Sequence, residues 1–426
     1  EAEMSRLYSS RGWVPLWLDG SGPSRPGRAA LGELLAAASH GLDPADYNGA
    51  ALDSMAGRLD GSRASARDLA RLDLLLSLSM RRYLDDLHTG RARFFPFARP
   101  ADEQVDWVAT LAEGVEGDSI PRLVEASEPR LTQYRNLRLL LAKYRTLAAD
   151  SALPRVHQIE LALERLRWLP RLSSHPFLVV NIPAFQLFAF DSAGGAGAPS
   201  LTMKVVVGKA MDAKTPMLFQ RLRYVEFRPY WNVPRSVLLA EMLPRLRRQP
   251  EYLRRHDMEV VSGEGRALGD SISPEIIRRL TKGELRVRQR PGPANALGLV
   301  KFAFPNAAGV YMHGTPEREL FSQARRDFSH GCIRVEDPAA VAAWVLGFEE
   351  GWPPERIASA MKGTATVRVV LTLRLDVAVY YTTVVATPDG TPEFYRDVYG
   401  RDEALTELLR RTRPAPPAIA EAPAPT

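Results

Sequence analysis

The hydrophobic pattern changes its period near residue 173, and this change divides the chain into two parts of different fold class. Upstream, apolar residues recur at helical spacing. The segments concerned are 30–44, 67–90, 131–149 and 156–170. From His175 onward, runs rich in β-branched and aromatic residues alternate with turn signals, which predicts mainly antiparallel strands. Because 426 residues exceed the usual size of one hydrophobic core, we predict an α+β protein with a helical scaffold domain over 1–173 and a mainly β domain over 174–400.

Two stretches depart from this plan. Residues 236–292 interrupt the strands with polar, Arg-rich and partly helical sequence, which indicates an insertion. Strand character then returns at 297–305 and 309–314. The end of the chain, 401–426, is predicted to form a helix followed by a disordered tail rich in Pro and Ala.

The charge balance excludes some classes of partner. The formal net charge is +6, but of 56 basic residues only seven are Lys, and 50 acidic residues are interspersed with them. No basic block of the kind that marks a nucleic-acid arm is present, so we predict no nucleic-acid partner. A mildly positive surface favours an anionic polymer instead. No apolar run reaches the ~20 residues that span a bilayer, so no transmembrane segment is predicted.

The segment FSHGCIRVEDP contains Cys332, the one cysteine of the chain, which therefore cannot form an internal disulfide. A nucleophilic thiol needs a neighbouring imidazole or another positive influence to supply thiolate at neutral pH. His330 lies two residues away, on the same face of an extended segment, and His313 lies upstream in GVYMHGT. Gly331 would let a substrate approach the main chain, and the amides of Gly331 and Cys332 could bind an oxyanion.

Two other interpretations of Cys332 compete with the nucleophile. A lone cysteine is usually a small buried hydrophobe, although the polar and glycine neighbours in Ser-His-Gly-Cys make a poor core strand. Alternatively, His313, His330 and Cys332 could bind zinc with an open fourth position. The absence of a nearby acidic general base of the HExxH kind disfavours this zinc site.

The motifs YMHGT and SHGCIR resemble the signature of the L,D-transpeptidase (YkuD-type) catalytic domain, a mainly β fold of cell-wall enzymes. Four flanking segments are similar to the larger Gram-negative YcbB-like members: FLVVNIPAFQLFAF, VVVGKAMDAKTPMLF, VEFRPYWNVP and FYRDVYGRDEAL. In the first half, SRGWVPLWL, HGLDPADY and RRYLDDLHTGRA resemble the helical scaffold of those members. The chain departs from them after YRNLRLLLAKYRTLAADSALP, where it lacks the usual separate peptidoglycan-binding module.

This resemblance implies roles for individual residues. Cys332 would be the nucleophile and His313 its base, with the main-chain oxygen of Gly314 orienting His313. His330 would then shape the site, and Gly331 would contribute an amide to the oxyanion hole. The residues implied in substrate binding are Ser329, Arg334, Tyr311, Met312, Tyr230, Trp231 and Asn232.

For some of these residues a structural role is an equal or better alternative. Arg334 would meet a substrate carboxylate or form an ordinary ion pair. Tyr230, Trp231 and Asn232 would line the donor groove or simply pack at a strand end. The insertion 236–292 matches the position of the substrate-capping subdomain of the family, which predicts a mobile lid.

The resemblance also implies a reaction. A stem tetrapeptide would acylate Cys332 with release of D-Ala, and the side-chain amine of a second stem would resolve the thioester to give a 3→3 cross-link. Water or a protein amine would resolve it in an L,D-carboxypeptidase or a protein anchor, and a non-catalytic wall-binding scaffold is a further alternative. No metal or organic cofactor is expected. The expected partners are peptidoglycan stem tetrapeptides as donor and acceptor and other cell-wall synthesis proteins, in the periplasm, with a role in cell shape and sensitivity to carbapenems.

Overall fold

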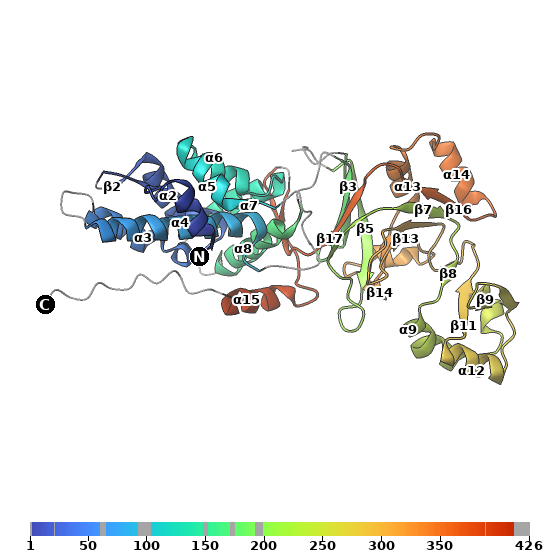
Figure 1. The fold of residues 1–426 in the computed structure, drawn as a ribbon. Coiled ribbons are helices and arrows are strands. Elements are labelled where there is room, and N and C mark those ends of the chain that lie inside the picture. Colours follow the sequence, from blue (N-terminus) through green and yellow to red (C-terminus); the bar gives the residue numbers. More distant parts are fainter. Residues whose placement is uncertain are drawn as a thin grey trace. The chain divides into compact units, whose positions relative to one another are not determined.

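A computed structural model describes residues 2–20, 22–59, 65–92, 104–147, 152–170, 175–191, 199–387 and 389–412. The chain forms two compact units (Figure 1). The first consists of Glu1–Leu172, Gly194–Gly197 and Tyr381–Thr426, and the second of Ser173–Ala193 and Ala198–Tyr380. The described part of the first is mainly helical and that of the second mainly β, which confirms the predicted α+β class.

One predicted boundary differs from the structure. The break between the units lies beside residue 173, but the second unit ends at Tyr380 and not at 400, because the strand 376–380 is the last one to join its large sheet. The following segment, 381–412, belongs to the first unit. The predicted disordered tail lies outside the described residues.

The longest described helix of the first unit, α4, contacts most of the other helices of that unit. The described helices are α1 (Ala2–Ser10), α2 (Arg25–Leu35), α3 (Gly49–Leu59), α4 (Ala66–Thr89), α5 (Trp107–Glu116), α6 (Ile120–Ser127), α7 (Thr132–Thr146), α8 (Leu153–Trp168) and α15 (Arg401–Arg411). Two small hairpins accompany them, β1 (Leu18–Asp19) with β2 (Gly22–Pro23) and β18 (Val384–Ala386) with β19 (Pro392–Phe394). Helix α4 begins where Ser65 accepts a hydrogen bond from the amide of Asp68 and ends at Gly90. Only residues 147–152 separate α7 from α8, which agrees with the absence of an inserted module.

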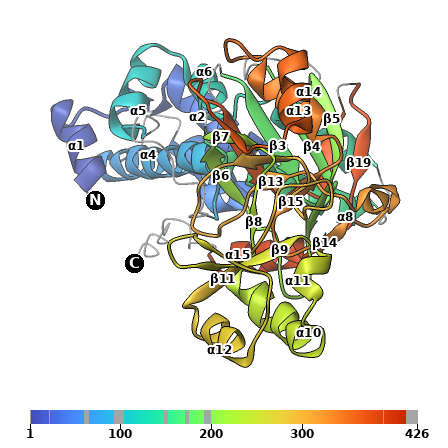
Figure 2. The same cartoon turned by 90° about the vertical axis from the view of Figure 1, so that its right-hand side faces the viewer.

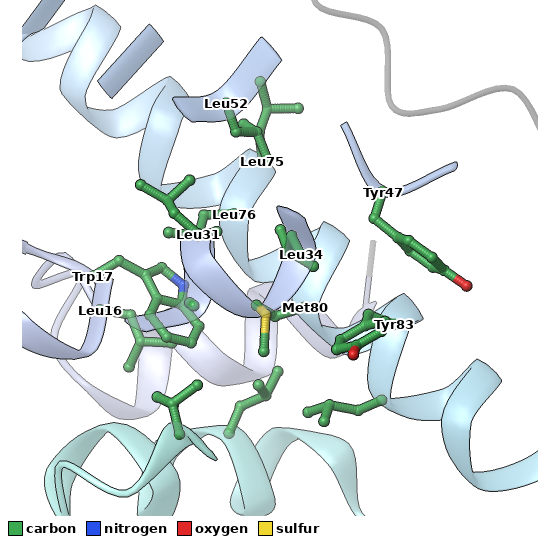
Figure 3. Close-up of a cluster of buried hydrophobic side chains, with 14 of the residues drawn as sticks. Leu16, Trp17, Leu31, Leu34, Tyr47, Leu52, Leu75, Leu76, Met80 and Tyr83 are labelled. Atoms are coloured by element: carbon green, nitrogen blue, oxygen red, sulfur yellow. The ribbon is translucent and has the colours of Figure 1, made fainter. Parts of the chain in front are cut away.

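The core of this unit forms where the apolar face of α4 meets α2 and the loop before β1. Leu76, Met80 and Tyr83 of α4 are fully buried in this cluster together with Trp17 (Figure 3). The carboxylate of Asp73 lies within α4 and is 2% exposed. It accepts hydrogen bonds from the Tyr8 hydroxyl (2.6 Å) and from the amides of Leu16 (3.0 Å) and Trp17 (2.7 Å). A buried carboxylate is thus compensated by three donors that fix the loop before β1.

The second unit is built on one large sheet. Its strands are β3 (Phe177–Asn181), β4 (Gln186–Phe190), β5 (Leu201–Gly208), β6 (Leu218–Arg221), β7 (Tyr224–Phe227), β12 (Val300–Ala303), β13 (Met312–His313), β14 (Asp327–Ser329), β15 (Ile333–Val335), β16 (Val367–Val370) and β17 (Asp376–Tyr380). Their order is β16-β7-β12-β13-β15-β5-β4-β3-β17-β6, and β14 also pairs with β5. Most pairs are antiparallel, as predicted, but β13 with β15, β14 with β5 and β17 with β3 are parallel. Helices α13 (Pro338–Leu346) and α14 (Pro354–Lys362) follow β15.

The insertion forms a lobe of its own, named here the cap (residues 231–289). Its helices are α9 (Arg235–Val237), α10 (Leu243–Arg248), α11 (Tyr252–Arg255) and α12 (Pro274–Lys282), with a π-helical turn at Leu238–Met242. Strands β8 (Trp231–Asn232), β9 (Met258–Ser262), β10 (Ala267–Gly269) and β11 (Leu285–Gln289) pair in the order β10-β9-β11-β8. Leu246, Leu253 and Leu280 are fully buried in a separate core, so the cap is a more ordered subdomain than its Arg-rich sequence indicated. Figures 1 and 2 both show the cap set apart from the large sheet.

None of the helices in the described residues has the length and apolar character needed to cross a membrane.

Candidate active site

The centre of the large sheet brings the two sequence motifs together. Strand β13 carries part of the first motif and pairs in parallel with β15, which begins within the second, so that His313 lies opposite Arg334. The Ile333 amide donates to the main-chain oxygen of Tyr311 at 3.0 Å, which places Cys332 beside Tyr311. Side chains alternate between the faces of a strand, so Tyr311, His313, Cys332 and Arg334 share one face. The rings of Tyr311 and His313, 5.7 Å apart between centroids, agree with this arrangement.

His313 is held in its neutral form. It is 5% exposed, and its Nδ1 lies 2.5 Å from the main-chain oxygen of Gly314. Because a carbonyl can only accept, Nδ1 carries the proton and Nε2 keeps the free lone pair. Burial, together with the charges of Arg334 and Lys301, lowers the pKa of His313 to about 3, against the opposing effect of the Gly314 oxygen. The Nδ1 contact with Gly314 therefore fixes which nitrogen of the ring carries the proton.

Cys332 is a free thiol that is partly exposed. Burial raises its pKa above the ordinary value, while the main chain and hydroxyl of Tyr311 and the charges of Lys301 and Arg334 oppose that rise. Cys332 and His313 therefore share one face as a neutral thiol and a neutral imidazole at physiological pH.

Side-chain hydroxyls fix the turn that carries Cys332. Ser329 is buried, donates to the main-chain oxygen of Cys332 (2.5 Å) and accepts from the amide of Gly331 (3.1 Å). Thr215 donates to the main-chain oxygen of Gly331 at 2.9 Å. Gly331 has φ +109°, a conformation that favours glycine. In this arrangement the Gly331 amide is engaged, whereas the Cys332 amide has no acceptor among the described residues.

His330 reaches the cap. Its Nε2 lies 2.6 Å from Oε1 of Glu241, which is in the π-helical turn Leu238–Met242. Both side chains are about two-fifths exposed, 44% for His330 and 41% for Glu241. Short π-helical turns recur at functional positions, and this one directs a carboxylate toward the Ser-His-Gly-Cys turn. His330 thus connects the site to the cap.

The residues implied in substrate binding have different surroundings. Arg334 forms an ion pair with Glu317, the structural alternative, while its charge also acts on His313 and Cys332. Met312 is fully buried, so its side chain packs in the core and offers no surface to a ligand.

Three predicted groove residues belong to the cap or its border. Trp231 and Asn232 form β8, which pairs with β11 of the cap sheet. Tyr230 is 37% exposed, and the guanidinium of Arg288 lies 4.3 Å from its ring centroid. These three side chains therefore lie where the cap leaves the large sheet.

The structure also shows residues that the sequence did not single out. Thr215 and Glu241 hold the Ser-His-Gly-Cys turn from two other segments, and Lys301 on β12 lies opposite His313. No three His, Cys, Asp or Glu side chains in the described part of the chain gather as metal ligands. His313, His330 and Cys332 accordingly do not come together as the zinc site considered from the sequence.

Comparisons with known proteins agree with this geometry. Residues 175–394 match the model of the L,D-transpeptidase catalytic domain (YkuD), and residues 2–141 match that of a scaffold domain. A protein of Haemophilus influenzae named "Putative L,D-transpeptidase" is 25% identical over 406 residues, which cover 94% of this chain and 78% of that protein. The catalytic-domain match spans more than half of the chain and includes both motifs, and the two domains occur in the order of the YcbB-like architecture. The chain therefore belongs to the YkuD-type L,D-transpeptidase family.

Proposed function

We propose that this protein is a peptidoglycan L,D-transpeptidase that joins two stem peptides by a 3→3 cross-link through an acyl-enzyme on Cys332. The observation that carries the proposal is the shared face of β13 and the turn before β15. There a lone thiol, a neutral imidazole with a free Nε2 and the Tyr311 hydroxyl gather on one side of the sheet.

The first half-reaction forms the thioester. Sγ of Cys332 attacks the carbonyl between the third residue of the stem, a diamino acid, and the terminal D-Ala, while the thiol proton passes to Nε2 of His313. The Cys332 amide and the Tyr311 hydroxyl are the proposed donors to the developing oxyanion. His313 then gives its proton to the departing D-Ala amine. Because burial makes the imidazolium of His313 unstable, this second proton transfer is strongly favoured.

The second half-reaction releases the product. The side-chain amine of a diamino acid on a second stem attacks the thioester carbonyl, and His313 removes a proton from this amine. The carbon–sulfur bond breaks, the proton returns to sulfur, and the thiol and the neutral imidazole are restored.

We also propose a periplasmic location, where peptidoglycan stems are available and a single cysteine escapes intramolecular disulfide formation. Since α7 passes almost directly into α8 without the usual wall-binding module, other cell-wall synthesis proteins are the proposed means of recruitment.

The proposal is tested by mass spectrometry of the protein and of its products after incubation with disaccharide-tetrapeptide, with Cys332→Ala as control. An acyl adduct on the wild type, D-Ala release and a 3→3 dimer support the proposal. D-Ala release with tripeptide alone would identify an L,D-carboxypeptidase instead. If neither the tetrapeptide nor a carbapenem leaves an adduct on Cys332, the acyl-enzyme is excluded and a wall-binding scaffold is the better description.

A further inference from the structure

We propose that Lys301 is a positioning residue of this active site, whose ammonium group stabilises the ionised thiol of Cys332 across the ring of Tyr311. The inference rests on the proposed role of Cys332 as nucleophile. Lys301 lies outside both sequence motifs, so the sequence alone indicated no role for it in the site.

The first argument is the register of the sheet. Across five adjacent strands, β16, β7, β12, β13 and β15, the paired positions form one continuous row of ionisable side chains. The row runs Arg368, Glu226, Lys301, His313, Arg334. Directly paired residues point to the same face of a sheet, so all five side chains lie on the face of the thiol.

The second argument is the position of the ammonium group. Nζ of Lys301 lies 4.1 Å from the ring centroid of Tyr311, a cation–π distance. The hydroxyl of the same ring stabilises the ionised form of Cys332. Lys301 is half-buried, so its charge is less screened than at the surface, and it acts on both Cys332 and His313.

The neighbours of Lys301 compensate its charge only in part. Glu226 is the nearest carboxylate in the row, but it also binds Arg368 at 2.6 Å, and Arg368 in turn covers the ring of Tyr224. On the other side stand the neutral His313 and the cationic Arg334, which pairs with Glu317. The row therefore presents net positive charge beside Cys332.

A nearby cation favours the ionised thiol here because the resting imidazole of His313 carries no charge. In a thiolate–imidazolium pair the histidine provides the compensating charge. Here burial keeps the resting His313 neutral, so the positive charges that act on Cys332 are those of Lys301 and Arg334. Burial lowers the pKa of Lys301 itself, an effect that the charges of Glu226 and of an ionised Cys332 oppose. Lys301 is one of only seven lysines in this Arg-rich chain.

The test measures how readily the Cys332 thiol ionises, and it does not use the transpeptidase reaction. Alkylation of Cys332 by iodoacetamide is followed by mass spectrometry in the full chain carrying His313→Ala, so that no imidazole acts as base and the rate reports the thiolate fraction. Adding Lys301→Met should raise the pKa of Cys332 and slow alkylation on the order of tenfold near pH 8. Lys301→Arg should restore most of the rate. Lys204→Met, which removes an exposed lysine on β5, is the matched control and should change nothing.

A role of Lys301 in folding alone predicts a different result. Thermal unfolding of each variant separates a role in thiol ionisation from a role in folding. A purely structural lysine would change the melting temperature without changing the alkylation rate of Cys332. If Lys301→Met does not fold, Lys301→Gln keeps a polar side chain without the charge and should show the same slowing. Unchanged alkylation in a folded, charge-free variant overturns the proposal. Since no stem peptide is used, this outcome is independent of whether the protein forms cross-links.

Discussion

His313 donates its Nδ1 proton to the main-chain oxygen of Gly314 over 2.5 Å, so the ring of this buried histidine keeps its free lone pair on Nε2. His330, although only two residues from Cys332, is instead bound to Glu241 of the cap. The two histidines near the thiol therefore differ in burial and in hydrogen-bond partner. One is enclosed and neutral, as a general base requires, and the other is exposed and engaged elsewhere.

This difference predicts unequal effects of substitution. His313→Ala should slow thioester formation by about 10²–10⁴-fold, the usual contribution of a general base, while His330→Gln should reduce it only a few-fold. Single-turnover release of D-Ala measures this step, and circular dichroism checks that both variants fold. Comparable losses in the two variants would contradict the assignment of His313 as base.

The pH dependence of acylation should also show whether Cys332 and His313 rest as a neutral thiol and a neutral imidazole. Between the pKa of His313, about 3, and the raised pKa of Cys332, the number of protons on the pair does not change, so the acylation rate should be constant. In His313→Ala only the thiolate reacts, and its fraction rises tenfold per pH unit below the thiol pKa. The loss caused by the substitution should therefore shrink as pH increases. A bell-shaped wild-type profile with an acid limb near pH 6 would mean that the imidazole titrates normally.

The sequence predicted those parts of the site that depend on neighbouring residues. It did not predict the parts that depend on contacts between segments far apart in the chain. The helical half, the strands and the two motifs depend on local patterns, and the histidine–cysteine pair was accessible through its resemblance to a known family. Lys301, Glu226 and Thr215 were not accessible, because their relation to Cys332 is created by strand register and turn contacts between distant segments. A row of paired charges leaves no periodic signal in one sequence.

The end of the second unit illustrates the same limit. VAVYYTTVVA has the composition of one continuous strand, but the structure divides it into β17, which joins the large sheet, and β18, which belongs to the first unit. Residue preferences give strand character and do not say which sheet a strand will join.

Asp73 predicts how the scaffold would lose stability. Asp73→Ala removes the acceptor of three hydrogen bonds in a buried position and should lower the free energy of unfolding of the first unit by about 3 kcal/mol. Urea unfolding monitored by hydrogen exchange in α4 measures this change. Asp53→Ala, at an exposed position on α3, should have little effect. Equal protection of α4 in both variants would show that the Asp73 hydrogen bonds contribute no net stability.

Substitution of Gly331 should slow acylation of Cys332 through a change in backbone conformation alone. A β-carbon at this position would meet its nearest atom, the main-chain oxygen of Ala213, at an ordinary 3.7 Å, so Gly331→Ala causes no clash. Its φ of +109° is nevertheless costly for alanine, by about 1–3 kcal/mol, and the turn should relax away from Ser329 and Thr215. We expect acylation of Cys332 by a carbapenem to slow on the order of 100-fold, because the nucleophile is displaced. Gly292→Ala, in open space with ordinary backbone angles, is the control, and equal acylation rates in the two variants would contradict the argument.

The contact between His330 and Glu241 predicts that the cap and the Ser-His-Gly-Cys turn act as one unit toward substrate. If this bond holds the π-helical turn in place, His330→Gln and Glu241→Gln should each raise KM, and the double variant should be no worse than either single one. The coupling should stay below about 1 kcal/mol, a few-fold in KM, since both side chains are substantially exposed. Hydrogen exchange in 238–248 should increase to the same extent in all three variants. Glu251→Gln removes an exposed carboxylate elsewhere on the cap and should leave both measurements unchanged. Additive increases in KM would show that His330 and Glu241 contribute independently, and the cap would then lack this connection to the Ser-His-Gly-Cys turn.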